Sequence, residues 1–153
     1  MHPIAAILAL VFMTMTSQVS AFNEQDRQRL AAANECSGCD LSGLDMSNGS
    51  FHGGDFSRSN LAGANLSEAV LTTANLQESN LRGANFRGAE LDRASLSGAD
   101  LTGANLADTD ISGADFSGVK GLTQAQLDNT CDDGSADPAF IRLPEGLTVK
   151  HCF

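Results

Sequence analysis

Four cysteines are the residues of this sequence with the widest chemical range. They form a close pair, Cys36 and Cys39, and a distant pair, Cys131 and Cys152. A Cys-x-x-Cys pair can be a disulfide, part of a zinc site or a redox centre. The cysteines also allow more than one disulfide connectivity. The choice depends on where the rest of the chain places the sulfurs.

His52 and the acidic side chains are the other candidates for chemistry. No Ser, Cys or Asp near His52 has the arrangement of a nucleophilic triad, so we interpret His52 as a surface imidazole. Exposed carboxylates are poor general acids or bases because nothing desolvates them. Gly53-Gly54-Asp55 is similar to part of a calcium-binding β-roll, but the repeat period differs. We therefore predict no catalytic residue, no cofactor and no metal site.

Length, composition and charge narrow the class of protein. The chain has 153 residues, enough for one domain, and 5% aromatic residues with no Trp or Tyr, which argues against an ordinary globular core. Its formal net charge is −10, and such a surface repels nucleic acid phosphates. The sequence therefore predicts no nucleic acid partner.

The first residues have the pattern of a signal peptide. An apolar run from Ile4 to Met15 precedes the small-residue site Val19-Ser20-Ala21, and we predict cleavage after Ala21. The run is shorter than the roughly 20 residues needed to span a bilayer. Residues 1–21 are thus expected to be removed, leaving a periplasmic or secreted protein with no membrane segment.

A five-residue repeat occupies the middle of the chain. A large apolar residue returns at every fifth position from Leu41 to Phe116, and a small residue lies two positions before nearly every one of these centres. The other three positions are polar almost throughout. The centres are Leu41, Met46, Phe51, Phe56, Leu61, Leu66, Leu71, Leu76, Leu81, Phe86, Leu91, Leu96, Leu101, Leu106, Ile111 and Phe116.

A period of five fits neither an α-helix nor a flat strand, because neither keeps such residues on one face. The chain must therefore bend within every repeat. Glycine recurs at the second position after the centre, where a type II turn requires positive φ. Non-glycine residues at this position, such as Arg58 and Glu68, are expected to lie in distorted turns.

The segments Ala64-Asn65-Leu66, Ala84-Asn85-Phe86 and Ala104-Asn105-Leu106 resemble the A-(D/N)-L-x-x motif of pentapeptide-repeat proteins. The resemblance covers residues 39–118. It implies an all-β fold, a right-handed quadrilateral β-helix with four pentapeptides per coil, in which the centre and the small residue point inward. Sixteen repeats then make four coils, a rod of about 19 Å at the usual strand spacing.

Both ends of such a solenoid need a cover. Residues 22–38 are expected to form an N-terminal cap, with a short helix from Asn23 to Ala33 followed by a Cys-x-x-Cys clip. Residues 119–153 are expected to form the C-terminal cap, with a capping-box helix that starts at Thr123 and a partly extended tail. Leu122, Leu127 and Ala125 would cover the last coil.

The length of the rod limits which cysteines can form disulfides with each other. Cys131 follows the far end, about 19 Å from Cys36 and Cys39, whereas a disulfide needs Cα atoms within about 7 Å. We therefore predict the disulfides Cys36–Cys39 and Cys131–Cys152. The same distance argues against one zinc site made by all four cysteines. Because Cys-x-x-Cys here precedes a strand instead of a helix, a structural clip is favoured over a redox centre.

These patterns predict a protein that is not an enzyme. We interpret it as a non-catalytic, exported structural or protein-binding module, a monomer with an unknown protein partner. One alternative is an acidic DNA mimic that inhibits a topoisomerase, as in quinolone-resistance pentapeptide proteins. Another is a periplasmic thiol redox or metal-binding protein. Four arginines map to four different faces and so form no basic stripe: Arg58, Arg82, Arg87 and Arg93.

Overall fold

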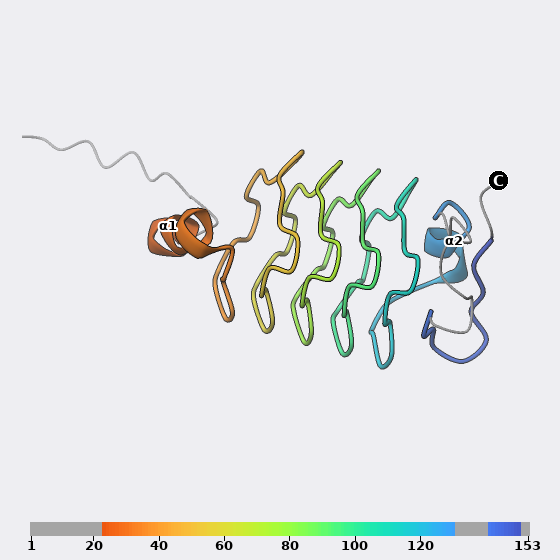
Figure 1. Cartoon of the computed structure of the whole chain (residues 1–153). Helices are drawn as coiled ribbons and strands as arrows, with labels where there is room; N and C mark the ends of the chain where they lie inside the picture. The colour runs from red at the N-terminus through yellow and green to blue at the C-terminus, as the bar shows by residue number, and fades with distance from the viewer. Residues whose placement is uncertain (1–22, 131–140, 151–153) are drawn as a thin grey trace, which may run out of the picture.

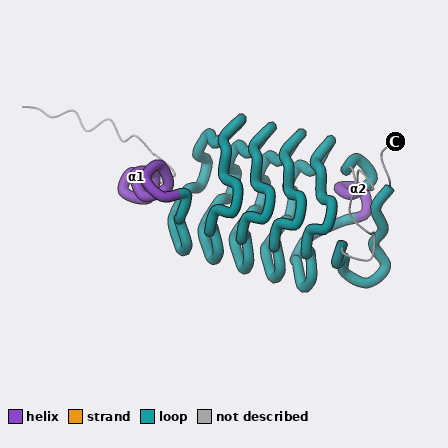
Figure 2. The backbone as a smooth tube through the Cα atoms, in the orientation of Figure 1, coloured by secondary structure: helices purple, strands orange, loops and turns teal. Residues whose placement is uncertain are grey.

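The computed structural model describes residues 23–130 and 141–150. The backbone winds into coils that stack as a rod, with α1 at one end and α2 at the other (Figure 1). α1 comprises Glu24–Ala33 and α2 comprises Gln124–Leu127. The chain between them is loop and turn (Figure 2). The two helices lie in the segments for which the sequence predicts caps.

Successive coils are joined by isolated parallel bridges between residues 20 apart, as in Asp40 with Asn60 and Asn60 with Asn80. At the first of these bridges, the Leu41 N–H donates to the Asn60 carbonyl at 2.8 Å, and the Asn60 N–H donates to the Cys39 carbonyl at 2.8 Å. Each bridge involves one residue per side of the coil. For that reason, no extended strand forms in the described part of the chain.

The bridged region is longer than the repeat region read from the sequence. It begins with Glu35 beside Asp55 and reaches Lys120 beside Asp100, so it extends past both ends of residues 39–118. The tail then adds one further bridge, Arg142 beside Asp115. The C-terminal segment therefore continues the stacking of the rod instead of only lying across its end.

The interior of the rod is filled by the two predicted columns. Most of the centres, and most of the small residues two positions before them, are almost completely buried. Three of the small inward residues carry hydroxyl groups, and each donates to a backbone carbonyl: Ser59 to Phe56 at 2.6 Å, Ser79 to Leu76 at 2.7 Å and Thr109 to Phe86 at 2.8 Å. Their burial therefore leaves no donor unsatisfied.

The turns are more uniform than the sequence predicts. Gly63 has φ 65° and Gly83 has φ 64°, whereas Arg58 and Glu68 have φ 56° and 57°. The expectation of distorted turns at non-glycine residues was wrong, because these residues adopt the same left-handed conformation as the glycines. They adopt it at a steric cost that glycine avoids.

Each helix starts with a defined cap. The Asn23 side chain accepts from the Gln25 N–H at 2.9 Å at the start of α1. Thr123 and Gln126 form the predicted capping box at the start of α2. Leu30 of α1 and Leu127 of α2 are buried against the two ends of the rod, but Ala125, which was expected to help cover the last coil, is exposed.

Candidate functional site

The disulfide between Cys36 and Cys39 lies inside the first coil. The two Cα atoms are 5.2 Å apart, and the residues are 0% and 1% exposed. Cys36 lies five residues before Leu41 and so takes a centre position, while Cys39 takes the small position of the next repeat. The sequence pattern predicts Cys36 within the cap of residues 22–38, in front of the rod. Its phase with Leu41 was the signal that could have placed it inside.

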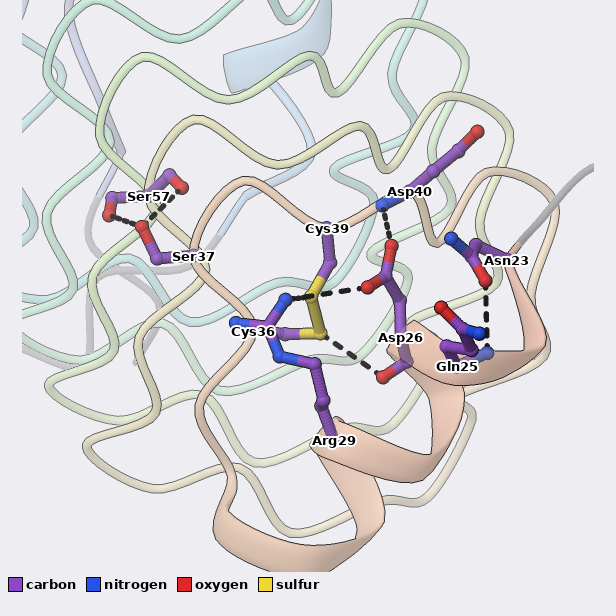
Figure 3. A network of polar contacts seen from close by, with 9 residues as sticks. All are labelled: Asn23, Gln25, Asp26, Arg29, Cys36, Ser37, Cys39, Asp40 and Ser57. Carbon is purple, nitrogen blue, oxygen red and sulfur yellow. Dashed lines mark hydrogen bonds and ion pairs between the residues drawn. A yellow bond between two sulfur atoms is a disulfide. The ribbon is translucent and has the colours of Figure 1, made fainter.

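Helix α1 is attached to the first coil through Asp26, which contacts Asp40 in Figure 3, and through the backbone of Asn23. The Asp40 N–H donates to Oδ2 of Asp26 at 2.8 Å, and the Asn23 N–H donates to the Asp40 carbonyl at 3.0 Å. Arg29 Nη1 lies 3.4 Å from Asp26 Oδ1 and donates to Sγ of Cys39 at 3.4 Å. The helix, the disulfide and Asp40 thus form one polar network.

This network does not have the features of a thiol redox centre. Both sulfurs are bonded to each other and buried, and Sγ of Cys36 lies 3.3 Å from the Asp26 carbonyl oxygen. A reactive thiol needs solvent access, which these two residues lack, although Arg29 lies beside Cys39. The geometry instead suits a structural link. The predicted partners Cys131 and Cys152 lie outside the described residues.

The outward polar side chains form hydrogen-bonded ladders along the rod. In each ladder an Asn Nδ2 donates to Oδ1 of the residue 20 positions earlier, and each ladder starts at an Asp in the first coil. The bonds are Asn60 to Asp40 at 3.0 Å, Asn80 to Asn60 at 2.9 Å, Asn65 to Asp45 at 3.0 Å, Asn85 to Asn65 at 3.1 Å, Asn105 to Asn85 at 3.0 Å and Asn75 to Asp55 at 3.1 Å.

Three of the outward carboxylates, those of Asp40, Asp45 and Asp100, have pKa values below the usual range. The Ser42 hydroxyl lowers the pKa of Asp40, and the Ser47 side chain lowers that of Asp45. For Asp100, the hydroxyl and the N–H of Thr102 together lower the pKa to about 2. Carboxylates with such low pKa values are weak bases and carry no proton to donate near neutral pH. Their hydrogen bonds are structural.

The remaining candidates do not converge on a reaction centre. His52 is exposed, and no group of three or more metal-ligating side chains occurs within residues 23–130 and 141–150. Arg58 pairs with Glu78 at 3.2 Å and Arg82 with Asp100 at 3.1 Å. These arginines are therefore partly neutralised and lie apart. None of the described helices is long and apolar enough to cross a membrane.

A groove of about 290 Å³ lies between α1 and the first coil. The sequence pattern did not predict this groove. Its one signal is Leu44, a bulky residue at a position where the repeat otherwise has a small side chain. Leu44 and Phe51 are only partly buried, in contrast to the equivalent residues of later coils. The groove is lined by Arg27, Leu30, Ala31, Asn34, Leu44, Asp45, Met46 and Phe51.

The stacked coils and their five-residue register define a repeat protein of the β-helical class. The family model for pentapeptide repeats matches residues 35–72, 50–88 and 79–118, with 8 copies. The chain belongs to the pentapeptide-repeat family, whose members form right-handed β-helices. The matched segments begin at Glu35, where the bridges of this structure also begin.

The chain is similar to solved structures of other pentapeptide-repeat proteins, and one of them shows the same fold. A trypsin-treated form of QnrB1, a plasmid-mediated fluoroquinolone resistance protein, is 20% identical, with a TM-score of 0.55 over 63% of this chain and 50% of its own. This chain thus spans half of that structure. Rfr23 from the cyanobacterium Cyanothece 51142 is 27% identical, with a TM-score of 0.38 over 82% of this chain and 98% of its own. No curated protein matches the chain.

Proposed function

We propose that this protein is an exported, non-catalytic binding module that presents rigid acidic faces to a protein partner. The observation that carries the proposal is the division between a filled interior and an ordered exterior. The inward columns are buried and the outward amides and carboxylates are fixed in ladders. A fixed surface loses little conformational entropy on binding, which favours recognition.

The charge of the surface indicates the chemistry of the partner. The chain has a formal net charge of −10, and ion pairs such as Arg82–Asp100 leave an excess of acidic groups on the outside of the rod. Complementary charge speeds association and selects partners by sign. We therefore expect the partner to offer a basic surface.

The buried disulfide favours this proposal over a thiol redox function. An internal disulfide supports a location in an oxidising compartment, where such bonds persist. The signal peptide proposed for residues 1–21 points to the same location. Residues 1–22 lie outside the described part of the chain, so this part of the proposal rests on the sequence.

Inhibition of a topoisomerase by DNA mimicry is the less favoured alternative. The likeness to QnrB1 is 20% in identity and one of fold, over half of that structure. An exported protein would also not meet a cytoplasmic topoisomerase. The location of the processed protein therefore separates the two functions.

The test combines location with partner capture in living cells. The full chain carries a C-terminal tag and a photo-cross-linking residue in place of Ala107, on the outside of the rod. We expect the protein in the periplasm or the medium, cleaved after Ala21. We also expect a cross-linked partner, and the double substitution Glu90→Lys with Asp110→Lys should abolish this cross-link. The matched control, Glu90→Gln with Asp110→Asn, should retain more of it. An unprocessed cytoplasmic protein would refute export, and cross-linking that is indifferent to charge would refute acidic recognition.

A further inference from the structure

The groove beside α1 lies next to an edge of the first coil that has no neighbouring coil. Within each later coil, the residue before the centre makes two backbone hydrogen bonds to the preceding coil. Asn65, for example, donates its N–H to the Leu44 carbonyl and accepts at its C=O from the Met46 N–H. No complete coil precedes residues 40–55, and the segment at Glu35 bridges them only at Asp55. The residues before the centres in this range are Asp40, Asp45, Ser50 and Asp55.

Two of these four positions are fully occupied. The Asp40 N–H donates to the carboxylate of Asp26, and its carbonyl accepts from the N–H of Asn23. The Asp55 N–H donates to the carbonyl of Asn34 at 3.2 Å, and its carbonyl accepts from the N–H of Cys36 at 2.7 Å. Helix α1 and the residues on either side of it thus replace a coil at these two corners.

Asp45 is not covered in this way. Neither its N–H nor its C=O has a backbone partner in residues 23–130 and 141–150, although its carboxylate accepts from the Ser47 N–H and from Asn65. The residue is exposed and lines the groove. An open bridging position and an apolar groove therefore lie side by side. Exposed strand edges of this kind are templates for strand addition.

We propose that an extended segment of a partner protein docks here, forms a parallel bridge with Asp45 and places apolar side chains in the groove. This inference rests on the proposed binding function and assigns it one site. The Asp55 bridge gives the geometry, because there the carbonyl of Asn34 and the N–H of Cys36 flank Glu35. In the same way, the residue opposite Asp45 would be flanked by an acceptor and a donor.

The geometry also sets the chemistry of the incoming segment. In every coil the bridged residue points outward and its two neighbours point inward, so the neighbours of the incoming residue would lie over Leu44 and Met46. Those neighbours should be apolar. The bridged residue itself would lie beside the Asp45 carboxylate and should be basic.

The charges around the groove support a basic residue. Arg27, the one cation of the lining, is engaged by Glu24 in two contacts, of 2.7 and 2.9 Å. Asp45 carries the remaining charge, because the Ser47 side chain lowers the pKa of its carboxyl group. The whole chain adds a formal net charge of −10. An acidic segment would be repelled at the groove and along the approach to it.

The floor of the groove is preformed. The Phe51 ring packs edge-on against Phe56, with ring centres 5.7 Å apart. It lies so close over Gly49 that a side chain there would collide with it. Glycine at this small position thus lets the ring fold over the backbone and remain partly exposed. A segment that docks here meets an ordered apolar surface, which limits the entropic cost of binding.

The experiment uses the protein as cells export it and a fluorescent peptide in which valine and lysine alternate. Binding is followed by fluorescence anisotropy. The matched variants are Ala31→Lys and Ala32→Lys, which place the same charge at neighbouring exposed positions of α1, although only Ala31 lines the groove. We expect Ala31→Lys to weaken binding by about tenfold or more and Ala32→Lys by less than about twofold.

Modified peptides separate strand addition from simple charge attraction. N-methylation of the valines removes the N–H groups that would donate to the Asp45 carbonyl, and we expect binding to be lost. N-methylation of the lysines removes N–H groups that point away, and binding should remain. A peptide with the same composition in two blocks has the same charge and should bind weakly.

Each other outcome would overturn the proposal. Absence of binding, equal effects of the two alanine substitutions, or equal effects of the two methylation patterns would each exclude strand addition at Asp45. Self-association that Ala31→Lys abolishes would identify a second copy as the occupant instead. A further result is that the peptide fails to bind at the groove while Glu90→Lys with Asp110→Lys still abolishes cross-linking in cells. That result would support the proposed function and exclude this site.

Discussion

The two ends of the rod face the same physical problem and cover their cores differently. At the N-terminal end, the carboxylate of Asp26 holds α1 to Asp40, and Arg29 of α1 contacts the buried disulfide of Cys36 with Cys39. At the C-terminal end, Gln126 of α2 donates to the carbonyls of Leu101 and Ala104, at 3.0 and 2.9 Å. Helix α1 is thus held by a carboxylate next to a disulfide-closed segment, whereas α2 is held by a side-chain amide.

The difference extends to the backbone edges. The C-terminal tail supplies a further bridge, in which the Phe116 N–H donates to the Arg142 carbonyl at 2.7 Å and the Arg142 N–H donates to the Ala114 carbonyl at 3.1 Å. At the N-terminal end, the N–H and C=O of Asp45 have no backbone partner in the described part of the chain. Adding a strand thus closes an edge that a helix laid across the end leaves open.

The largest expected effect comes from the leucine beneath α2. Leu127 is 0% exposed, and Leu127→Ala should lower the free energy of unfolding by about 3 kcal/mol, through lost burial and the cavity left behind. The matched change Leu30→Ala, at a residue that is 8% exposed, should cost about 2 kcal/mol. Urea unfolding measures both. A larger loss at Leu30 would reverse the ranking of the two ends.

Removal of the disulfide is the next largest effect. Cys36→Ala with Cys39→Ala should lower the free energy of unfolding by about 2 kcal/mol, because the unfolded chain gains entropy and the lost sulfurs leave a small void. The loss stays modest because the loop that the disulfide closes is short. Hydrogen exchange should rise in α1 and stay unchanged in α2. Equal loss of protection at both ends would show that the disulfide stabilises the whole rod and not its first coil.

The amide of Gln126 is predicted to contribute less. Gln126→Ala removes the side-chain donor to the Ala104 carbonyl and to the Leu101 carbonyl, which still accepts from the Ala104 N–H, and it removes part of the capping box. It should therefore cost about 1–2 kcal/mol. Thermal unfolding gives the value, and Gln28→Ala, at an exposed residue of α1, is the control. A loss no larger than that of the control would mean that solvent satisfies these carbonyls.

A turn in the middle of the rod provides a reference that belongs to neither end. Thr73 is β-branched and has φ 59°, a conformation that is costly for such a residue. Thr73→Gly should therefore raise the free energy of unfolding by about 0.5–1 kcal/mol. Thr72→Gly, one residue earlier and not at positive φ, should lower it. Destabilisation by both would show that the loss of chain entropy outweighs the relief of strain.

The smallest effect is that of acid. The folded-state pKa of Asp100 is about 2, below the usual value of 3.8. The carboxylate therefore contributes its full stabilisation above pH 3.8. This stabilisation is lost as the pH falls toward about 2. Melting temperatures measured from pH 5 to about 2 should fall, and Asp100→Asn should make the decline shallower. An identical decline in the variant would assign the acid sensitivity to other carboxylates.

The interior of the rod could be predicted from the sequence because every coil repeats the same packing. A buried Leu or Phe at a fixed interval is a local signal, and Leu81 and Phe86 are both fully buried as the register requires. The pentapeptide family also followed from this register. The caps were predictable in outline, since Asn23 and the Thr123–Gln126 pair are recognisable start signals for helices.

The candidate site was less predictable because it depends on contacts that no repeat specifies. The place of Cys36 inside the first coil follows from the bridge between Glu35 and Asp55. The groove depends on the direction in which α1 leaves the coil, which Asp26 sets by binding the N–H of Asp40. Partners 14 residues apart in different elements have no periodic signature.

The ladders give the rod a modular length. Each Asn donates to the residue 20 positions earlier, so one coil makes the same side-chain bonds as the next. Deleting or duplicating 20 residues would keep each cap on its own face and each ladder in line. A change of five residues, although it preserves the repeat, would rotate one cap by a quarter of a coil and misalign its contacts. The unit in which such a protein can be lengthened is therefore the coil and not the pentapeptide.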